Sequence, residues 1–530
     1  MAQRVELAAT AAQAYSDPFQ EVEVSVVFTD PAGQIRQVPA FWAGGQQWRV
    51  RYASALAGSH HYRWVASNPA DSGLHGRTGS IDLLPSAAPL ALDRHGDLRV
   101  SQNRRQLEFA DGTPFFWLGD TWWLGFVQRS GWGLGEFCTL AADRAAKGFS
   151  VVQIVAGLYP DLPPYDPRGF NEAGHPWEPA YARINPAYFD AADSRVVALV
   201  NAGLVPCIVA AWGYHLPWLG VERMKQHWRY LIARWGSYPV IWCLAGEATM
   251  PYYLSEQREA DALFQKQGWT EIGRYVRATD PYHRLVTIHP TRIGREQVED
   301  DAVIDIDLLQ TGHGDWATTP STVTSVTQEY ARRPAMPVVI GEVCYEGHMQ
   351  ISWHGVQRFM FWSAVLSGAA GHTYGAGGIW QMNTRLQPHG PSPHGGTYEN
   401  TPWDEAAQLP GATHLGRARA LLLRYPWWQF EPCPDSVEPR WSPDNYFLPY
   451  AAGVGETIRF VYIPARIYRW TGPLVKNLRP CADYRAYYFD PIQGVDYDLG
   501  QWVTSTEGTW QAPDVPLAQD WVLVVELLSA

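Results

Sequence analysis

Two short apolar runs in this chain each end in a glutamate. Residues 239–246 run directly into Glu247, and residues 337–341 run directly into Glu342. An apolar run of this length is typical of a buried parallel strand. An ionised carboxylate is costly to bury without a partner, so a glutamate at such a position is poor core material. The matched endings therefore predict a pair of carboxylates that face one pocket.

Paired carboxyl groups can cleave a glycosidic bond. One carboxylic acid protonates the departing oxygen, while a carboxylate acts on the other face of the sugar ring. We assign Glu247 as the acid/base and Glu342 as the nucleophile. Either glutamate alone could equally form an ion pair or cap the following helix, but the pair after matched apolar runs favours catalysis.

Other hydrolytic chemistries lack their motifs. No serine nucleophile of the G-x-S-x-G type occurs. A metal-dependent hydrolase on a barrel would place a His-x-His after the first strand, where this chain has Gly119-Asp120-Thr121. The histidines at 289 and 313 with Asp315 do not form a ligand pattern either. We expect neither a metal ion nor a cofactor.

Strand-like runs alternate with amphipathic stretches between residues 90 and 425. The strands are expected at 115–119, 151–155, 205–210, 240–244, 285–288, 304–309, 338–340 and 371–374. The helices are expected at 134–147, 187–202, 221–235, 255–278 and 356–367. Eight such repeats predict a closed (β/α)8 barrel. A doubly wound open sheet is the alternative, but no glycine-rich dinucleotide motif follows any strand. The weakest repeats are the fifth and sixth, since 291–301 is a poor helix.

The regions on either side of this segment read as all-β. Short alternating strands separated by turns fill roughly the first 85 residues, and a similar pattern returns after Trp427. We therefore expect a multidomain protein, α/β plus all-β, with a central TIM barrel between two small β-sandwiches. The expected domains are 1–88, 89–428 and 429–530.

Chemistry in such barrels lies at the C-terminal ends of the strands, which here are polar and aromatic. Flat aromatic rings suit stacking on sugar faces. The substrate-contact candidates at these ends are Asp120, Trp122, Trp212, His289, His313, Tyr345, His372 and Trp380. The segment 375–412 has no strong periodicity, and we expect it to roof the pocket.

The composition limits the classes of molecule that the protein is expected to bind. A net charge of −12 argues against nucleic acid or an acidic membrane surface. The chain has no apolar run long enough to span a membrane, and its first 20 residues lack the pattern of a secretory leader. The six cysteines are scattered without metal spacing. We expect a cytoplasmic protein whose partner is a carbohydrate, and leave the oligomeric state open.

Several segments resemble one known family. Residues 109–123, 234–247, 337–342 and 371–375 look like those of the apiosidase-like glycoside hydrolases, and 403–412 resembles that family's lead into its last barrel helix. The N-terminal region is similar to the all-β domain that often precedes such barrels. The C-terminal region resembles a collagen-binding-type β-sandwich, a name that we do not take as its function.

This resemblance implies a retaining mechanism with the acid/base after strand four and the nucleophile after strand seven, which here are Glu247 and Glu342. Two departures matter. Related barrel glycosidases commonly have an Asn before the acid/base that binds the sugar 2-hydroxyl, and this chain has Gly246. The apiosidase-like group can carry Asp as the acid/base, and the longer Glu247 argues against apiose itself.

The expected function is therefore a retaining glycoside hydrolase for a small glycoside or oligosaccharide. Pentosides and furanosides are among the candidate substrates. The alternative is a carbohydrate-binding protein on the same scaffold that has lost catalysis.

Overall fold

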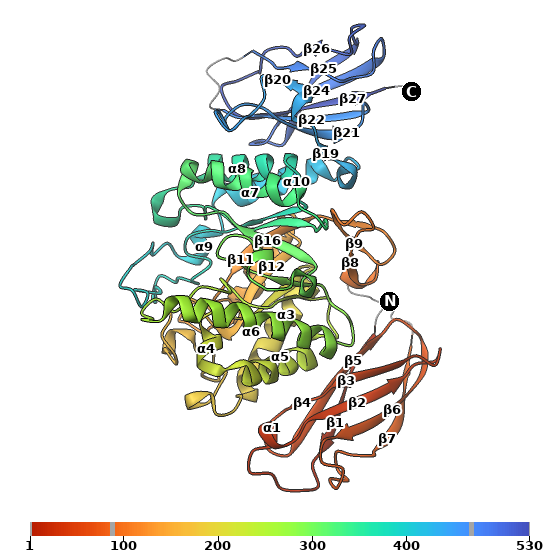
Figure 1. Ribbon diagram of the computed structural model, residues 1–530, viewed down its shortest axis with the longest axis vertical. Coiled ribbons are helices and arrows are strands. Elements are labelled where there is room, and N and C mark those ends of the chain that lie inside the picture. The colour runs from red at the N-terminus through yellow and green to blue at the C-terminus, as the bar shows by residue number, and fades with distance from the viewer. Residues whose placement is uncertain (1–2, 85–90, 466–470, 529–530) are drawn as a thin grey trace.

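The computed structural model describes residues 3–84, 91–465 and 471–528. Figure 1 shows three parts along the long axis, with antiparallel sheets at each end and a barrel between them. The boundary expected between residues 88 and 89 lies outside the described residues. The second boundary, at 428/429, falls inside the short 3₁₀ helix Trp427–Gln429.

The central part is a closed barrel of eight strands, as the sequence predicted. Its parallel strands follow chain order: β11 (Trp117–Trp122), β12 (Val151–Leu158), β13 (Val205–Ala211), β14 (Ile241–Cys243), β15 (Val286–Ile288), β16 (Ile306–Gln310), β17 (Val338–Glu342) and β18 (Gly371–Tyr374). Every residue of β12 is buried, because the barrel covers one face of the strand and helices cover the other.

The helices around the barrel are α2 (Leu134–Ala146), α3 (Pro186–Asn201), α4 (His215–Leu219), α5 (Val221–Trp235), α6 (Arg258–Thr279), α7 (Thr319–Ala331), α8 (His354–Leu366), α9 (Trp403–Ala406) and α10 (Pro410–Leu422). Of these, α2, α3, α5, α6 and α8 lie close to the expected positions, whereas α4, α7, α9 and α10 were not among the expected helices. Between β15 and β16 the chain forms two 3₁₀ turns, Gly294–Glu296 and Asp301–Val303, in place of an α-helix. This is the repeat whose helical pattern was weak.

The first barrel strand differs from its predicted bounds. The prediction was 115–119, whereas β11 runs over Trp117–Trp122. Phe115 belongs instead to β10 (Pro114–Phe115), which pairs antiparallel with β9 (Leu107–Phe109) in a small sheet with β8 (Leu98–Val100). The strand therefore continues through Asp120 and Trp122, which the prediction had placed after its end.

The N-terminal part consists of two antiparallel sheets and a short helix, α1 (Pro18–Glu21). One sheet has the order β1 (Gln3–Thr10), β5 (Gln47–Ser54), β4 (Phe41–Trp42). The other has the order β3 (Ile35–Pro39), β2 (Val24–Thr29), β6 (Gly58–Ala66), β7 (Thr78–Leu83). The all-β prediction for this region is confirmed.

The C-terminal part packs on the barrel through α8. Its larger sheet has the order β19 (Glu431–Pro432), β21 (Tyr450–Val454), β22 (Ile458–Ile463), β27 (Trp521–Leu527), β24 (Asp483–Asp490), β25 (Val495–Val503), and a smaller sheet joins β20 (Val437–Glu438), β23 (Leu474–Val475) and β26 (Trp510–Gln511). The ring of Phe359 on α8 contacts Tyr450 and Tyr462 edge-on, and Arg358 forms a buried ion pair with Asp520 at 2.7 Å. Among the described residues, no helix has the length and apolar character needed to cross a membrane.

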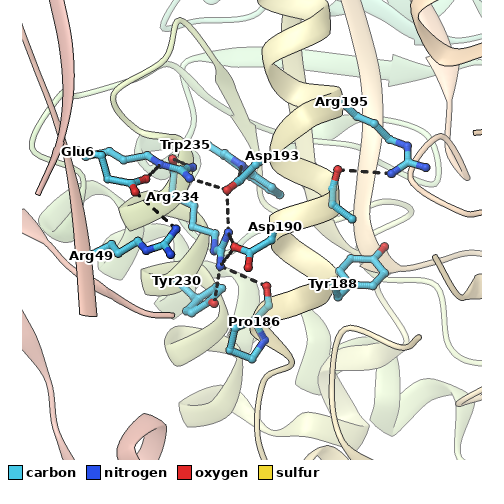
Figure 2. A network of polar contacts seen from close by, with 12 residues as sticks. Glu6, Arg49, Pro186, Tyr188, Asp190, Asp193, Arg195, Tyr230, Arg234 and Trp235 are labelled. Atoms are coloured by element: carbon cyan, nitrogen blue, oxygen red, sulfur yellow. Dashed lines mark hydrogen bonds and ion pairs between the residues drawn. The ribbon is translucent and has the colours of Figure 1, made fainter. Parts of the chain in front are cut away.

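A buried charge network joins the N-terminal sheets to the barrel (Figure 2). Arg234 on α5 is fully buried and donates to Asp190 at 2.9 Å and to Asp193 at 2.8 Å, both on α3. Arg51 on β5 donates to the same Asp193 oxygen at 2.5 Å and to Glu6 on β1 at 2.9 Å. A buried cation is stable only when it is paired, so Asp193 holds two elements of the barrel and one N-terminal strand in register.

We expect Asp193→Ala to destabilise the protein by ~1.5–3 kcal/mol, the usual contribution of hydrogen bonds to a charged group, because Arg234 keeps Asp190 and Arg51 keeps Glu6. The measurement is the unfolding temperature by calorimetry. Asp435→Ala is the control, because Asp435 pairs with Arg440 at the surface and should change the unfolding temperature little. An equal response of the two variants would contradict a structural role for the Asp193 network.

Candidate active site

A cavity of about 220 Å³ opens at the C-terminal ends of the barrel strands. Six aromatic side chains line it: Trp123, Trp212, Tyr253, Tyr345, Trp380 and Tyr398. Three carboxylic acids also line it: Asp161, Glu247 and Glu342. The two glutamates singled out by the sequence therefore lie in one cavity.

Glu247 follows β14 and is hydrogen-bonded through both carboxyl oxygens. Trp212 Nε1 donates to Oε2 at 3.2 Å, and Gln310 Nε2 donates to Oε1 at 2.9 Å. Burial raises the pKa of Glu247, and the negative charge of Glu342 raises it further, against the hydrogen bond from Gln310. Its environment therefore favours the protonated acid.

Glu342 is the last residue of β17 and lies between two histidines. His313 Nε2 is 2.7 Å from Oε1, and His289 Nε2 is 3.1 Å from Oε2, the latter within ion-pair distance but not aligned for a hydrogen bond. Burial alone would raise the pKa of Glu342, but the interactions with His289 and His313 outweigh it and hold the pKa well below its usual range. Its environment therefore favours the ionised carboxylate.

The cavity separates the protonation states of its two glutamates. An acid and a carboxylate with pKa values pushed apart are what general acid catalysis beside a nucleophile needs. The neighbours responsible come from different strands, since His289 follows β15, and Gln310 and His313 come from the end of β16 and just beyond it. Barrel closure is what brings them together.

Four of the eight predicted substrate contacts line the cavity: Trp212, His313, Tyr345 and Trp380. His289 lies behind Glu342, fully buried, and reaches the cavity only through that carboxylate. Trp380 comes from the segment 375–412, which also supplies Tyr398 to the lining.

The structure places Asp120, Trp122 and His372 outside the cavity lining. Asp120 and Trp122 lie within β11 and face α2, where the Asp120 carboxylate accepts hydrogen bonds from Trp122 Nε1 at 2.8 Å and from Arg144 Nε at 2.6 Å. His372 lies within β18 against Phe361 of α8, and burial lowers its pKa to about 3. All three side chains are fully buried.

Trp123 is a lining residue that the sequence reasoning passed over in favour of its neighbour. Side chains alternate along a strand, so a strand that includes Asp120 and Trp122 on its outer face turns Trp123 inward. Its Nε1 donates to the Tyr345 hydroxyl at 3.0 Å, and its ring meets Trp212 edge-on. Alternation of inward and outward side chains could have predicted this position of Trp123, but only if the strand had been expected to continue to Trp122.

The other unexpected lining residues lie outside the strands, except Gln310, which is the last residue of β16. Asp161, Met250, Tyr253, His348 and Tyr398 follow no strand end directly. No periodic pattern marks such positions. Across residues 3–84, 91–465 and 471–528, no group of three or more His, Cys, Asp or Glu side chains is arranged to hold a metal ion.

Gly246 has a steric reason to be glycine. A Cβ at this position would lie 2.1 Å from Cε3 of the Trp212 ring, far inside van der Waals contact. The Trp212 ring thus occupies the space that a side chain before Glu247 would need. Glu247 itself has a φ of +38°, a left-handed backbone conformation that costs energy in a non-glycine residue.

Gly246→Asn should therefore displace Trp212, break its bond to Glu247 and destabilise the protein by about 1–3 kcal/mol, as overpacking does. The checks are the unfolding temperature and the Trp fluorescence spectrum. Gly135→Asn is the matched control, because a Cβ there meets nothing within 4 Å. A Gly246→Asn protein as stable as wild type, with an unchanged spectrum, would contradict this packing.

Several solved structures of glycoside hydrolases have a similar fold. A glycoside hydrolase family 5 protein from Bacteroides vulgatus matches with a TM-score of 0.64 at 20% identity, covering 82% of this chain and 94% of the other. A candidate glycoside hydrolase from the same organism matches with a TM-score of 0.72 at 17% identity, covering 99% and 98%. Another structure described as a glycoside hydrolase gives 0.64 at 21% identity, covering 82% and 98%. At these identities the likeness concerns the fold.

These likenesses define the fold class, a barrel of the kind found in glycoside hydrolases, here with an acid-lined cavity at its strand ends. The family model described as "Apiosidase-like, catalytic domain" matches residues 101–429, and the domain of unknown function DUF5060 matches residues 3–67. No curated protein matches the chain. The chain belongs to the apiosidase-like family.

Proposed function

We propose that this protein is a retaining glycoside hydrolase in which Glu342 is the nucleophile and Glu247 the acid/base. The observation that carries the proposal is the opposed protonation of two carboxyl groups in one aromatic-lined cavity. Membership of the apiosidase-like family supports the same roles, because both glutamates lie at the matching strand ends.

In the first step the Glu342 carboxylate attacks the anomeric carbon while Glu247 protonates the departing oxygen. The glycosidic C–O bond breaks, and its electron pair leaves with that oxygen. His313 and His289 keep Glu342 ionised before the attack. Burial and the charge of Glu342 keep Glu247 protonated.

In the second step water replaces the protein at the anomeric carbon. Formation of the glycosyl ester removes the negative charge of Glu342, which had raised the pKa of Glu247. With that charge gone and the proton already donated, Glu247 is the stronger acid and remains ionised, ready to take a proton from water. The electrostatic interaction between Glu342 and Glu247 thus serves both half-reactions.

The cavity dimensions support a small substrate. Its volume of about 220 Å³ is below the ~300–1,000 Å³ of pockets for drug-sized ligands. It therefore suits one terminal sugar rather than several. Three of its aromatic walls, Trp123, Trp212 and Trp380, offer faces or edges for stacking. The family name supports pentosides as the first substrates to try.

Glu342→Gln should abolish turnover of a panel of 4-nitrophenyl pentosides and hexosides, and Glu247→Gln should lower kcat by ~10²–10⁴-fold, the usual contribution of general acid–base catalysis. Released nitrophenolate is the measurement. Glu405→Gln, at an exposed ion pair with Arg385, is the control. Saturable sugar binding without turnover by the wild type would favour the non-catalytic alternative.

The pH profile of kcat/KM should be bell-shaped. As pH falls, kcat/KM declines only below the lowered pKa of Glu342; as pH rises, it declines above the raised pKa of Glu247. His313→Gln removes a hydrogen bond and a positive charge that lower the pKa of Glu342, so the acidic limb should move to higher pH. An unmoved limb in that variant would contradict the role of His313.

The anomeric configuration of the first product tests retention. ¹H NMR of a fresh digest should show the configuration of the substrate, and a 2-fluoro glycoside should label Glu342 covalently. Inversion would overturn the assignment of Glu342 as nucleophile while leaving hydrolysis itself intact.

A further inference from the structure

A third carboxylic acid lies in the cavity and has no part in the proposed reaction. Asp161 follows β12 by three residues, lines the cavity and is only 6% exposed. Its φ of +53° is unusual for a residue other than glycine. Such strain persists where the surrounding structure requires it, and it clusters at functional sites.

The Asp161 carboxylate is only partly satisfied by the protein. The Tyr253 hydroxyl lies near enough to lower the pKa of Asp161, whereas Oδ1 is buried and has no hydrogen-bond partner. Three other lining residues also have buried polar atoms without hydrogen-bond partners: Gln310 Oε1, Glu342 Oε2 and Trp380 Nε1. Buried polar groups are nearly always paired, so these atoms together indicate a polar ligand with several hydroxyl groups.

Asp161 is close enough to the two glutamates to act on the same sugar. The negative charge of Glu342 is felt at Asp161, and that of Asp161 is felt at Glu247. Asp161 comes from the second strand's loop, whereas the glutamates follow strands four and seven. If a sugar lies between the two glutamates, the hydroxyl groups that contact Asp161 are remote from the glycosidic bond that breaks.

Charge in the cavity selects against acidic sugars. Among the described lining residues there is no Lys or Arg. The two lining histidines are already engaged with carboxylates: His313 with Glu342 at 2.7 Å and His348 with Glu399 at 3.0 Å. A sugar carboxylate would add a negative charge beside Asp161 and Glu342 with no free cation to offset it.

We propose that Asp161 is a specificity-determining residue that accepts hydrogen bonds from two adjacent hydroxyl groups of a neutral terminal sugar, and that the cavity rejects uronic acids. The inference rests on the proposed glycosidase function, because it names the substrate class for that cavity. A carboxylate suits the task, since each oxygen can accept one hydroxyl proton while Tyr253 fixes its orientation.

The test compares Asp161→Asn with wild type on 4-nitrophenyl glycosides of neutral pentoses and hexoses and on the corresponding glucuronide. Asn tolerates the left-handed backbone, so the variant should fold. We expect hydrolysis of a neutral glycoside but not of the glucuronide, and a ~10–100-fold lower kcat/KM in the variant, the loss typical of a hydrogen bond to a charged group.

Monodeoxy analogues of the best substrate locate the contact. Removing a hydroxyl that Asp161 binds should lower the kcat/KM of the wild type about as much as Asp161→Asn does. The same analogue should lower the kcat/KM of Asp161→Asn little further. Tyr253→Phe should lower kcat/KM in the same direction, because it frees the carboxylate to rotate. Tyr252→Phe is the matched control, since the neighbouring tyrosine does not line the cavity.

The outcomes separate this inference from the proposed function. If neutral glycosides are hydrolysed and Glu342→Gln stops hydrolysis, the glycosidase function stands. The role of Asp161 is then overturned if Asp161→Asn stays within twofold of the wild-type kcat/KM, or if the glucuronide reacts as well as the neutral glycosides. If nothing is hydrolysed, thermal shifts with neutral monosaccharides decide. Stabilisation of wild type but not of Asp161→Asn supports the contact, and equal or absent shifts overturn it.

Discussion

The contact between Glu342 and its two histidines is the interaction on which the site depends. A carboxylate 5% exposed at the end of a barrel strand would normally take up a proton or destabilise the fold. His313 and His289 oppose both, because His313 hydrogen-bonds to one oxygen of the carboxylate and the His289 ring nitrogen lies 3.1 Å from the other. The charge that they preserve then raises the pKa of Glu247. One buried interaction thus sets the protonation of both glutamates.

That interaction requires a rigid barrel, and the flanking sheets contribute to its rigidity. The N-terminal strands are tied to α3 and α5 through Asp193, which pairs with a buried arginine from each side. The C-terminal sheet is tied to α8 through Arg358 and Asp520, both buried. Helices α5 and α8 lie outside strands that carry site residues, so the two β parts brace the barrel from opposite ends (Figure 1).

Packing inside the site explains its departure from related barrels. Trp212 donates to Glu247 and its ring fills the space beside Gly246, so the residue before Glu247 has no room for a side chain. Under the proposed function, hydrogen bonds to the sugar come from groups elsewhere in the cavity. Gln310, Trp380 and Asp161 have buried polar atoms free for it, and they come from three different parts of the barrel rim.

The sequence by itself determined the alternation of strands and helices, the two all-β ends and the positions of Glu247 and Glu342, because apolar periodicity and abrupt strand endings are local properties. Tertiary structure decided which other side chains line the cavity with these two glutamates. The strand β11 continues to Trp122, beyond its predicted end, with Trp122 facing outward, so the next residue, Trp123, faces the cavity. Asp161 and Tyr253 lie in loops without periodicity, and only closure of the barrel brings them to the same cavity.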